Sequence, residues 1–413
     1  MSVTPEAIAS GPYPQGERTI MRTIQVLAIT AVASLLLTGS ASASDVEAEL
    51  QAMQERIEQL EGERLSEANS FAAEQASGSG LSSMLENTEM AGWVAASYNY
   101  NFEGFKNSAG TTNNVPGPIP TSNSFSIDQA WLSISNPADE NGRGGVQMEL
   151  ESGNSATGTG GTAGLNVFTA NASYLAPIGN GMLLTGGLMG TLIGAEVNQQ
   201  NGNFNVTRGL VWGLQPVNVL GATVGTNLTD EISIVIGVTN DHYANALADT
   251  NNEKVVTGQI AWANKDSRIG FSFNYGDDGG DTNMFIGDIL LSYDGIEDFS
   301  TWVNYTVLST DDDAGATVPG EGEIHGISVA GRLALADDMG IALRGEAVIT
   351  DTDTVETEIY SLTITGDKSL TDHLTAKAEV RLDFDADDGL PNDKGFPTED
   401  VAAIILAQLI YEF

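Results

Sequence analysis

The sequence contains no cysteine and few basic residues. Its 413 residues include 16 Lys and Arg against 56 Asp and Glu, a formal net charge of −40. The absence of cysteine excludes disulfides, thiolate chemistry and an N-terminal cysteine that carries lipid. The shortage of cations excludes nucleic acid as a partner, because phosphate recognition depends on Lys and Arg. Charged residues make up 17% of the chain, below the share of about 25% that is usual in soluble domains.

Apolar runs long enough for a membrane-spanning helix are also missing. The longest apolar stretch, 27–37, falls short of the roughly 18 residues that a transmembrane helix needs. It follows Arg22 and precedes the small residues 41–43, which is the layout of a secretory signal peptide. We predict a mis-called start over residues 1–20 and a signal peptide over 21–44. The alternative for this stretch is an N-terminal anchor helix.

From about Gly92 to the C-terminus, apolar side chains occupy every second position. Similar sets recur along the chain, such as those within 232–238 and 327–335. Side chains alternate across a strand, so the pattern predicts strands with one apolar face. A soluble protein seldom exposes such strands, whereas a barrel in a bilayer requires them. The last strand shows the pattern best, with Val401, Ala403, Ile405, Ala407, Leu409, Tyr411 and Phe413 on one face.

The connections between these strands alternate in length. Short ones such as 264–267 and 336–339 take turns with long acidic ones such as 241–253 and 385–400. Short turns on one side and long loops on the other are typical of outer-membrane barrels. We therefore predict an all-β fold over residues 90–413, a transmembrane antiparallel up-and-down β-barrel of about 16 strands. A soluble β-sandwich would show the same alternation, but the signal peptide, the aromatic C-terminus and the number of strands favour the barrel.

Two positions in the first half of this region interrupt the pattern. The alternation changes phase near Gln129, which predicts a β-bulge. Pro216 interrupts another apolar segment; because proline cannot donate a ladder hydrogen bond, we expect it at a strand edge or in a loop folded into the barrel mouth. Aromatic residues near strand ends, Trp93 and Tyr275 among them, are candidates for the aromatic girdles at the membrane interfaces.

A short helix is predicted between the signal peptide and the barrel. Apolar residues from Val46 to Leu60 are spaced by four and three residues, with Glu and Gln between them. This is the heptad pattern of a coiled coil. We expect residues 45–65 to form a periplasmic helix that either joins sister copies as a coiled coil or stays single, packed at the barrel mouth or solvated. Residues 66–89 are rich in Ser, Ala and Gly and are predicted to be a linker.

These features together resemble the OmpL-like β-barrel porins of Gram-negative bacteria. The resemblance is carried by the segment 208–240, the closing residues 411–413 and the helical segment after the signal peptide. It implies an outer-membrane pore for small hydrophilic solutes. It also implies that the barrel-assembly machinery reads the terminal aromatic strand, which points here to Tyr411 and Phe413 as the assembly signal.

Charged side chains gather on the other face of several predicted strands. In a barrel they project into the lumen, where charge requires water or a counter-charge. One hypothesis is a constriction whose field orients polar solutes. The other, which we favour, is a ladder of ion pairs that braces the wall. The pore-lining candidates are Asp288, Arg332, Arg344, Glu346, Lys377, Glu379, Arg381 and Asp383.

One acidic segment has the composition of a weak calcium site. Clustered carboxylates suit Ca²⁺, but the EF-hand spacing fails because Asp388 stands where glycine belongs. A solvated acidic loop is the simpler interpretation, so we predict no metal and no other cofactor. The carboxylates concerned are Asp383, Asp385, Asp387, Asp388 and Asp393.

Histidine is scarce, with His242, His325 and His373 as the three residues of this kind. Asp241 beside His242 is a pair that an outer-membrane hydrolase could use, but no activated serine or second Asp pair can be placed next to it. We therefore predict that the protein is not an enzyme.

The function that these observations favour is passive diffusion of small hydrophilic solutes or ions across a bacterial outer membrane. The acidic long loops should favour cations. Expected partners are outer-membrane lipid, the assembly machinery and sister copies in a homo-oligomer such as a trimer. The alternative is a structural outer-membrane barrel whose coiled coil mediates oligomerisation or envelope tethering.

Overall fold

The computed structural model describes most of the predicted barrel region. The signal peptide, the helix at 45–65 and nearly all of the linker lie outside the described residues, as do Asp387, Asp388 and Asp393. The described ranges are 88–102, 123–154, 164–243, 253–277, 283–311, 321–385, 390–391, 397–399 and 401–413.

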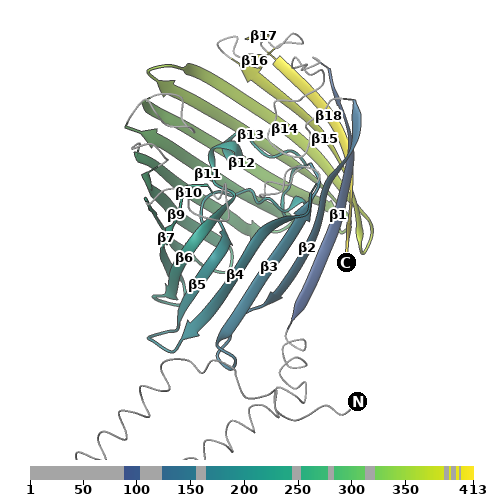
Figure 1. The fold of residues 1–413 in the computed structure, drawn as a ribbon. Helices are drawn as coiled ribbons and strands as arrows, with labels where there is room; N and C mark the ends of the chain where they lie inside the picture. The colour runs from purple at the N-terminus through teal and green to yellow at the C-terminus, as the bar shows by residue number, and fades with distance from the viewer. Residues whose placement is uncertain are drawn as a thin grey trace, which may run out of the picture. The chain divides into compact units, whose positions relative to one another are not determined.

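The described residues form a closed antiparallel barrel of sixteen strands (Figure 1). Each strand pairs with its neighbours in the sequence, and β18 closes the ring between β15 and β1. The strands are β1 (Glu89–Asn101), β2 (Ser124–Asn136), β3 (Gly144–Ser152), β4 (Asn166–Ala176), β5 (Met182–Gly190), β6 (Asn218–Asn227), β7 (Ile232–Thr239), β8 (Val255–Ala263), β9 (Ser267–Asp277), β10 (Asn283–Ile296), β11 (Phe299–Thr310), β12 (Gly322–Ala336), β13 (Met339–Thr352), β14 (Glu356–Thr371), β15 (Leu374–Asp385) and β18 (Val401–Glu412).

Two shorter kinds of element accompany the barrel. The strands β16 (Leu390–Pro391) and β17 (Pro397–Glu399) pair with each other in the connection between β15 and β18. The 3₁₀ helices η1 (Gln200–Gly202) and η2 (Val211–Leu214) lie between β5 and β6. Within the part of the chain that is described, no helix has the length and apolar character needed to cross a lipid bilayer.

The sixteen-strand barrel confirms the predicted fold and its alternation of faces. Outward positions are apolar and exposed, such as Ile236 and Leu343, whereas inward positions such as Asn274 and Thr363 are buried and polar. The connections also alternate as predicted. Those at 264–266, 297–298 and 337–338 are tight turns on the same edge as the two ends of the barrel. The longer ones lie on the opposite edge, where 353–355 is an exception in being short as well.

The predicted bulge is present in β2. Ala95 and Ala96 of β1 face Gln129 and Ile127, so Asp128 is the extra residue in the ladder. A bulge places two consecutive side chains on the same face of a strand. Asp128 and Gln129 are accordingly both fully buried inside the barrel, where they bind other polar groups.

Two sequence-based expectations differ from the structure. Trp93, a girdle candidate, is 6% exposed and faces inward, stacked on Trp131 at a ring-centroid distance of 5.1 Å. Its indole N–H donates to Gln129 at 2.8 Å, so it is a core residue rather than an interfacial one. The inner face of β18 is also more apolar than expected, because Ile404 and Ile410 are each 1% exposed there. Something inside the barrel therefore has to cover apolar surface.

Candidate functional site

The element that covers this surface is the connection between β5 and β6, residues 191–217, which we call the inner loop. It contains η1 and η2 and otherwise no regular structure. Figure 1 shows it as the teal segment that crosses the interior of the barrel. Pro216 belongs to it, as predicted for a loop folded into the mouth. Lacking regular structure, the inner loop must find partners for its backbone polar groups on the barrel wall.

The first set of partners is on β13. Arg344 is fully buried, and its Nη1 donates to Glu196 Oε1 at 2.6 Å and to the carbonyl of Thr207 at 2.7 Å. Its Nε lies 3.0 Å from Glu346 Oε2. The Glu346 carboxylate also accepts the backbone N–H of Val211 at 3.3 Å. One guanidinium thus joins a wall carboxylate to a carboxylate of the inner loop.

Strand β15, which β14 separates from β13, supplies the second set. The Glu379 carboxylate accepts the backbone N–H of Val206 at 2.5 Å and that of Thr207 at 3.0 Å. Arg381 Nη1 donates to the carbonyl of Arg208 at 2.6 Å. Farther along, Lys377 Nζ donates to the carbonyl of Asn203 at 2.7 Å. These charged side chains therefore bind the backbone of the inner loop, in hydrogen bonds of the stronger, charge-assisted kind.

Beyond β18 and β1, strands β2 and β3 bind the inner loop through a glutamine and a glutamate. On the β2 bulge, Gln129 accepts the backbone N–H of Gln200 at 2.9 Å and donates to the carbonyl of Asn198 at 3.0 Å. The Asn198 side chain in turn donates to Glu151 on β3 at 2.8 Å. The bulge explains this contact, since without it Gln129 would share a face with outward residues.

A third contact lies on β10 and β11. Gln215 Nε2 donates to Asn304 Oδ1 and to Thr306 Oγ1, each at 2.8 Å. The Asp288 carboxylate accepts the backbone N–H of Gly194 at 3.2 Å and the Asn304 amide at 2.7 Å. Both ends of the inner loop are therefore fixed to the same pair of strands.

Apolar contacts complete the anchoring. Val206 is fully buried against Ile404 and Leu406 of β18. Near the start of the inner loop, Ile193 packs into a buried cluster with Met284 and Leu308. Burying such side chains contributes roughly 1.5–3 kcal/mol each. This is the cover that the apolar inner face of β18 requires.

Burial shifts the pKa of two charged groups in the inner loop. It raises the pKa of the Glu196 carboxyl above its ordinary value; the attraction of Arg344 opposes this shift and the repulsion of Glu346 adds to it. Burial likewise lowers the pKa of Arg208 to about 10, against the attraction of Glu196. The inner loop therefore brings charges of both signs into a region with little water.

The eight pore-lining candidates all lie on the inward face, but most of them are covered. Arg332 is the partly exposed one, and it pairs with Asp367 of β14 at 2.6 Å. Asp383 pairs with Arg381 at 2.8 Å. Contact between these charges and solute stays a prediction. The seven buried ones are Asp288, Arg344, Glu346, Lys377, Glu379, Arg381 and Asp383.

The other predicted residues have simpler surroundings. Tyr411 and Phe413 are exposed on the outward face, and their part in assembly stays a prediction. Across the described ranges, no group of three or more His, Asp and Glu is arranged to hold a metal ion. His242 is buried, with Nε2 3.1 Å from the carbonyl of Gly276. The His325 ring has its Nδ1 2.8 Å from the Tyr305 hydroxyl and its Nε2 3.0 Å from the Glu323 carboxylate.

A cavity of about 280 Å³ lies between the inner loop and the wall at β3 and β4. About half of its lining is polar: Gln147, Glu149 and Thr169 come from the wall, and Asn198 and Gln199 from the inner loop, whereas Phe168 and Trp212 are among the apolar residues. No Lys or Arg is among the residues that line it. Glu149 was not among the residues predicted to line the pore, because a lone acidic residue in a strand carries no distinctive signal in the sequence.

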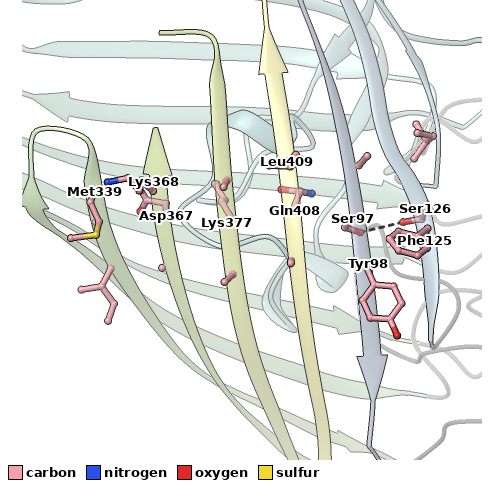
Figure 2. Close-up of a pocket in the computed structure, with 18 of the residues that line it drawn as sticks. Ser97, Tyr98, Phe125, Ser126, Met339, Asp367, Lys368, Lys377, Gln408 and Leu409 are labelled. Atoms are coloured by element: carbon pink, nitrogen blue, oxygen red, sulfur yellow. Dashed lines mark hydrogen bonds between the residues drawn. The ribbon is translucent and has the colours of Figure 1, made fainter. Parts of the chain in front are cut away.

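The outer surface has a groove of its own where the barrel closes, with a volume of about 930 Å³. Its floor is a row of small residues on neighbouring strands, Gly366, Ala378 and Ala407. Figure 2 shows Tyr98 and Phe125 at one end of the groove and Met339 at the other. Small side chains between large ones hollow the surface here.

A closed sixteen-stranded barrel with an apolar outer face and a loop folded inside defines a porin-like outer-membrane protein. The family model described as "Putative beta-barrel porin-2, OmpL-like" matches residues 87–413, and the chain belongs to this family. The resemblance seen in the sequence is thereby confirmed. No curated protein matches the sequence.

Solved structures of the same fold include three bacterial outer-membrane proteins. The anion-selective porin from Comamonas acidovorans is 14% identical, with a TM-score of 0.55 over 79% of this chain and 99% of that one. The trimer form of OmpT from Vibrio cholerae is 12% identical, with a TM-score of 0.54 over 79% and 99%. OprB from Pseudomonas putida at high pH is 11% identical, with a TM-score of 0.54 over 80% and 96%. At these identities the similarity establishes the fold alone.

Proposed function

We propose that the protein is a non-enzymatic porin that lets small hydrophilic solutes diffuse across a bacterial outer membrane. The observation that carries this proposal is the cavity between the inner loop and strands β3 and β4, about half of whose lining is polar. A barrel that only filled its interior would bring the inner loop against the wall on every side. Here Arg344 and Glu379 hold the inner loop on β13 and β15, and beside β3, where Asn198 of the loop donates to Glu151, a partly polar space remains.

We further propose that the pore prefers cations. The chain carries 40 more acidic than basic residues, and acidic groups around a confined opening raise the local concentration of cations. The Comamonas acidovorans porin of the same fold is anion-selective, so selectivity has to come from side chains and not from the barrel itself.

Planar-bilayer recording of the purified barrel under a gradient of KCl tests both parts of the proposal. We expect discrete conductance steps and a reversal potential whose sign shows that K⁺ permeates more readily than Cl⁻. Conductance steps with a Cl⁻ preference would contradict the proposed cation preference. A correctly folded barrel without conductance would contradict the porin function.

The hydrogen bonds and ion pairs between the barrel wall and the inner loop favour one alternative, a structural barrel whose lumen the loop plugs. The fully buried Arg344 and Arg381 both bind the loop backbone, which suits a permanent plug. In that case the segment 45–65 would give the protein its role by joining copies or tethering the envelope. Deleting 45–65 discriminates, because an envelope defect with a non-conducting barrel supports the plug, whereas unchanged conductance supports the porin.

We also propose that the protein forms a homo-oligomer in the outer membrane. The outer groove with the floor Gly366, Ala378 and Ala407 supports this, since small residues let two backbones approach closely in lipid. The OmpT structure of the same fold is a trimer form. Electrophoresis of the detergent-extracted protein without heating tests the proposal; a single band at the mass of one barrel would contradict it.

A further inference from the structure

The charges inside the barrel are divided between two sides of the inner loop. Arg344, Lys377 and Arg381 lie on β13 and β15 and donate to the loop backbone. The cavity lies on the other side, against β3 and β4, and no Lys or Arg lines it. The basic side chains of the wall are thus separated from the cavity by the inner loop.

Two carboxylates line the cavity, and they differ in their partners. Glu196 belongs to the inner loop and is neutralised by Arg344 at 2.6 Å. Glu149 belongs to β3, and its carboxylate accepts the hydroxyl of Thr169 at 2.8 Å. Among the described residues no Lys or Arg lies within ion-pair distance of Glu149. Glu149 is therefore the carboxylate whose charge is left to act on the cavity.

The strand geometry holds Glu149 in this place. The ladder between β3 and β4 shifts register after Glu149, so Phe168 is the extra residue on β4. Phe168 and Thr169 are consequently both buried. The ring of Phe168 packs on that of Trp131 with a centroid distance of 4.8 Å, and the Thr169 hydroxyl donates to the Glu149 carboxylate. The position of Glu149 is therefore fixed by its own hydrogen bond and by a packed aromatic neighbour.

We infer that permeating ions pass between the inner loop and strands β3 and β4, and that Glu149 sets the cation preference of the pore. The inference rests on the proposed porin function. A single uncompensated carboxylate in a narrow space with protein walls attracts cations more strongly than one in open water. The predicted wall charges on β13 and β15 then position the inner loop, and the wall at β3 and β4 selects the ion.

The first test compares reversal potentials of three barrels in planar bilayers. Glu149→Gln keeps an acceptor for Thr169 but removes the charge, and we expect it to lower the K⁺/Cl⁻ permeability ratio by about threefold or more. Glu149→Lys should reverse the preference. Glu356→Gln removes one carboxylate from the exposed outward face of β14 and should leave the ratio unchanged.

The second test locates the passage and uses the absence of cysteine from the chain. A cysteine at Glu149→Cys should react with a water-soluble methanethiosulfonate reagent and change the conductance. A cysteine at Ser361→Cys should not react, because Ser361 is buried on β14 and is not among the residues that line the cavity. Glu149→Cys also serves where Glu149→Gln or Glu149→Lys gives no folded barrel.

The outcomes separate the inference from the function beneath it. A conducting wild-type barrel whose ion preference is the same in Glu149→Gln, with a Glu149→Cys thiol that does not react, overturns the inference and leaves the porin function in place. A folded wild-type barrel that conducts no ions removes both. A lowered permeability ratio together with a reactive thiol at residue 149 supports the inference.

Discussion

Arg344 and Glu196 form a buried ion pair at 2.6 Å that joins the barrel wall to a loop 148 residues earlier in the chain. The pair lies where strand β13 meets the inner loop, and neither side chain is more than 5% exposed. A buried ion pair adds little to stability when it is complete, but removal of one partner leaves an uncompensated charge. The contact therefore fixes the position of the inner loop more than it strengthens the barrel.

Replacing Arg344 should release the inner loop. Arg344→Met leaves Glu196 and Glu346 buried without their cation, and we expect a loss of about 3–5 kcal/mol in the free energy of unfolding. Urea unfolding in lipid vesicles measures the loss, and single-channel recordings should show larger and noisier steps. The matched control is Arg332→Met, whose pair with Asp367 is partly exposed and should contribute about 1 kcal/mol or less. Equal losses in the two variants would contradict a special role for Arg344.

The pH dependence of stability should carry the signature of Glu196. Burial raises the pKa of this carboxyl in the folded protein, so the folded state binds its proton at a pH where the unfolded chain does not. Stability should therefore rise as the pH falls from the raised pKa toward the ordinary value of 4.5. Glu196→Gln should remove this rise.

Two measurements check the effect of pH on Glu196. Urea midpoints between about pH 7 and pH 5 should change in the wild type more than in Glu196→Gln. Hydrogen exchange of the Gly209 amide, which donates to Glu196 at 2.5 Å, reports on the inner loop directly. Parallel pH profiles in the two proteins would show that Glu196 titrates near its ordinary pKa.

The last residue contributes to barrel closure in two separable ways. The backbone of Phe413 donates to and accepts from Gly92 of β1, at 2.9 and 3.1 Å, and its ring is exposed on the outer face. Deleting Phe413 should remove both contributions and reduce the yield of heat-modifiable, folded barrel in the outer membrane. Phe413→Ala keeps the backbone bonds, so any loss of yield in that variant measures the contribution of the ring as an assembly signal. A yield equal to wild type in both variants would rule out that signal.

Filling the outer groove should prevent association of copies. Ala378→Trp places a large side chain on the floor between Gly366 and Ala407, and we expect the unheated protein to migrate as a single barrel. The control is Ile289→Trp on β10, an exposed outward position that is not part of the groove. An oligomer that survives Ala378→Trp would mean that copies meet elsewhere.

The barrel could be predicted from the sequence because its signal is local. Lipid outside and polar groups inside impose a period of two on every strand, so sets such as Ile327–Leu335 identify their outward faces without knowledge of their neighbours. The bulge at Asp128 also left a local trace, a change of phase within one strand. The stacking of Trp93 on Trp131 left no such trace, because an aromatic residue near a strand end looks the same in the sequence whether it lies at the membrane interface or in the core.

The inner loop and its contacts could not be predicted in the same way. Glu196, Asn198 and Val206 follow no period, and their partners Arg344, Gln129 and Ile404 come from three different strands. The sequence indicated that the wall carries inward charges, and it favoured ion pairs within the wall. In the structure most of those charges are satisfied by a loop that reaches them across the barrel.

The sequence by itself determined the closed barrel, its strand faces and its family, since each strand must match lipid on one side through its own residues. Tertiary structure alone decided which of the inward charges have a charged partner. Arg344 and Glu149 look alike in the sequence as charged residues on inward faces. Folding buries both side chains, but it pairs the first with Glu196 of the inner loop and places the second in the lining of a cavity, without a Lys or Arg partner among the described residues, because only the closed ring brings residues 191–217 against these strands.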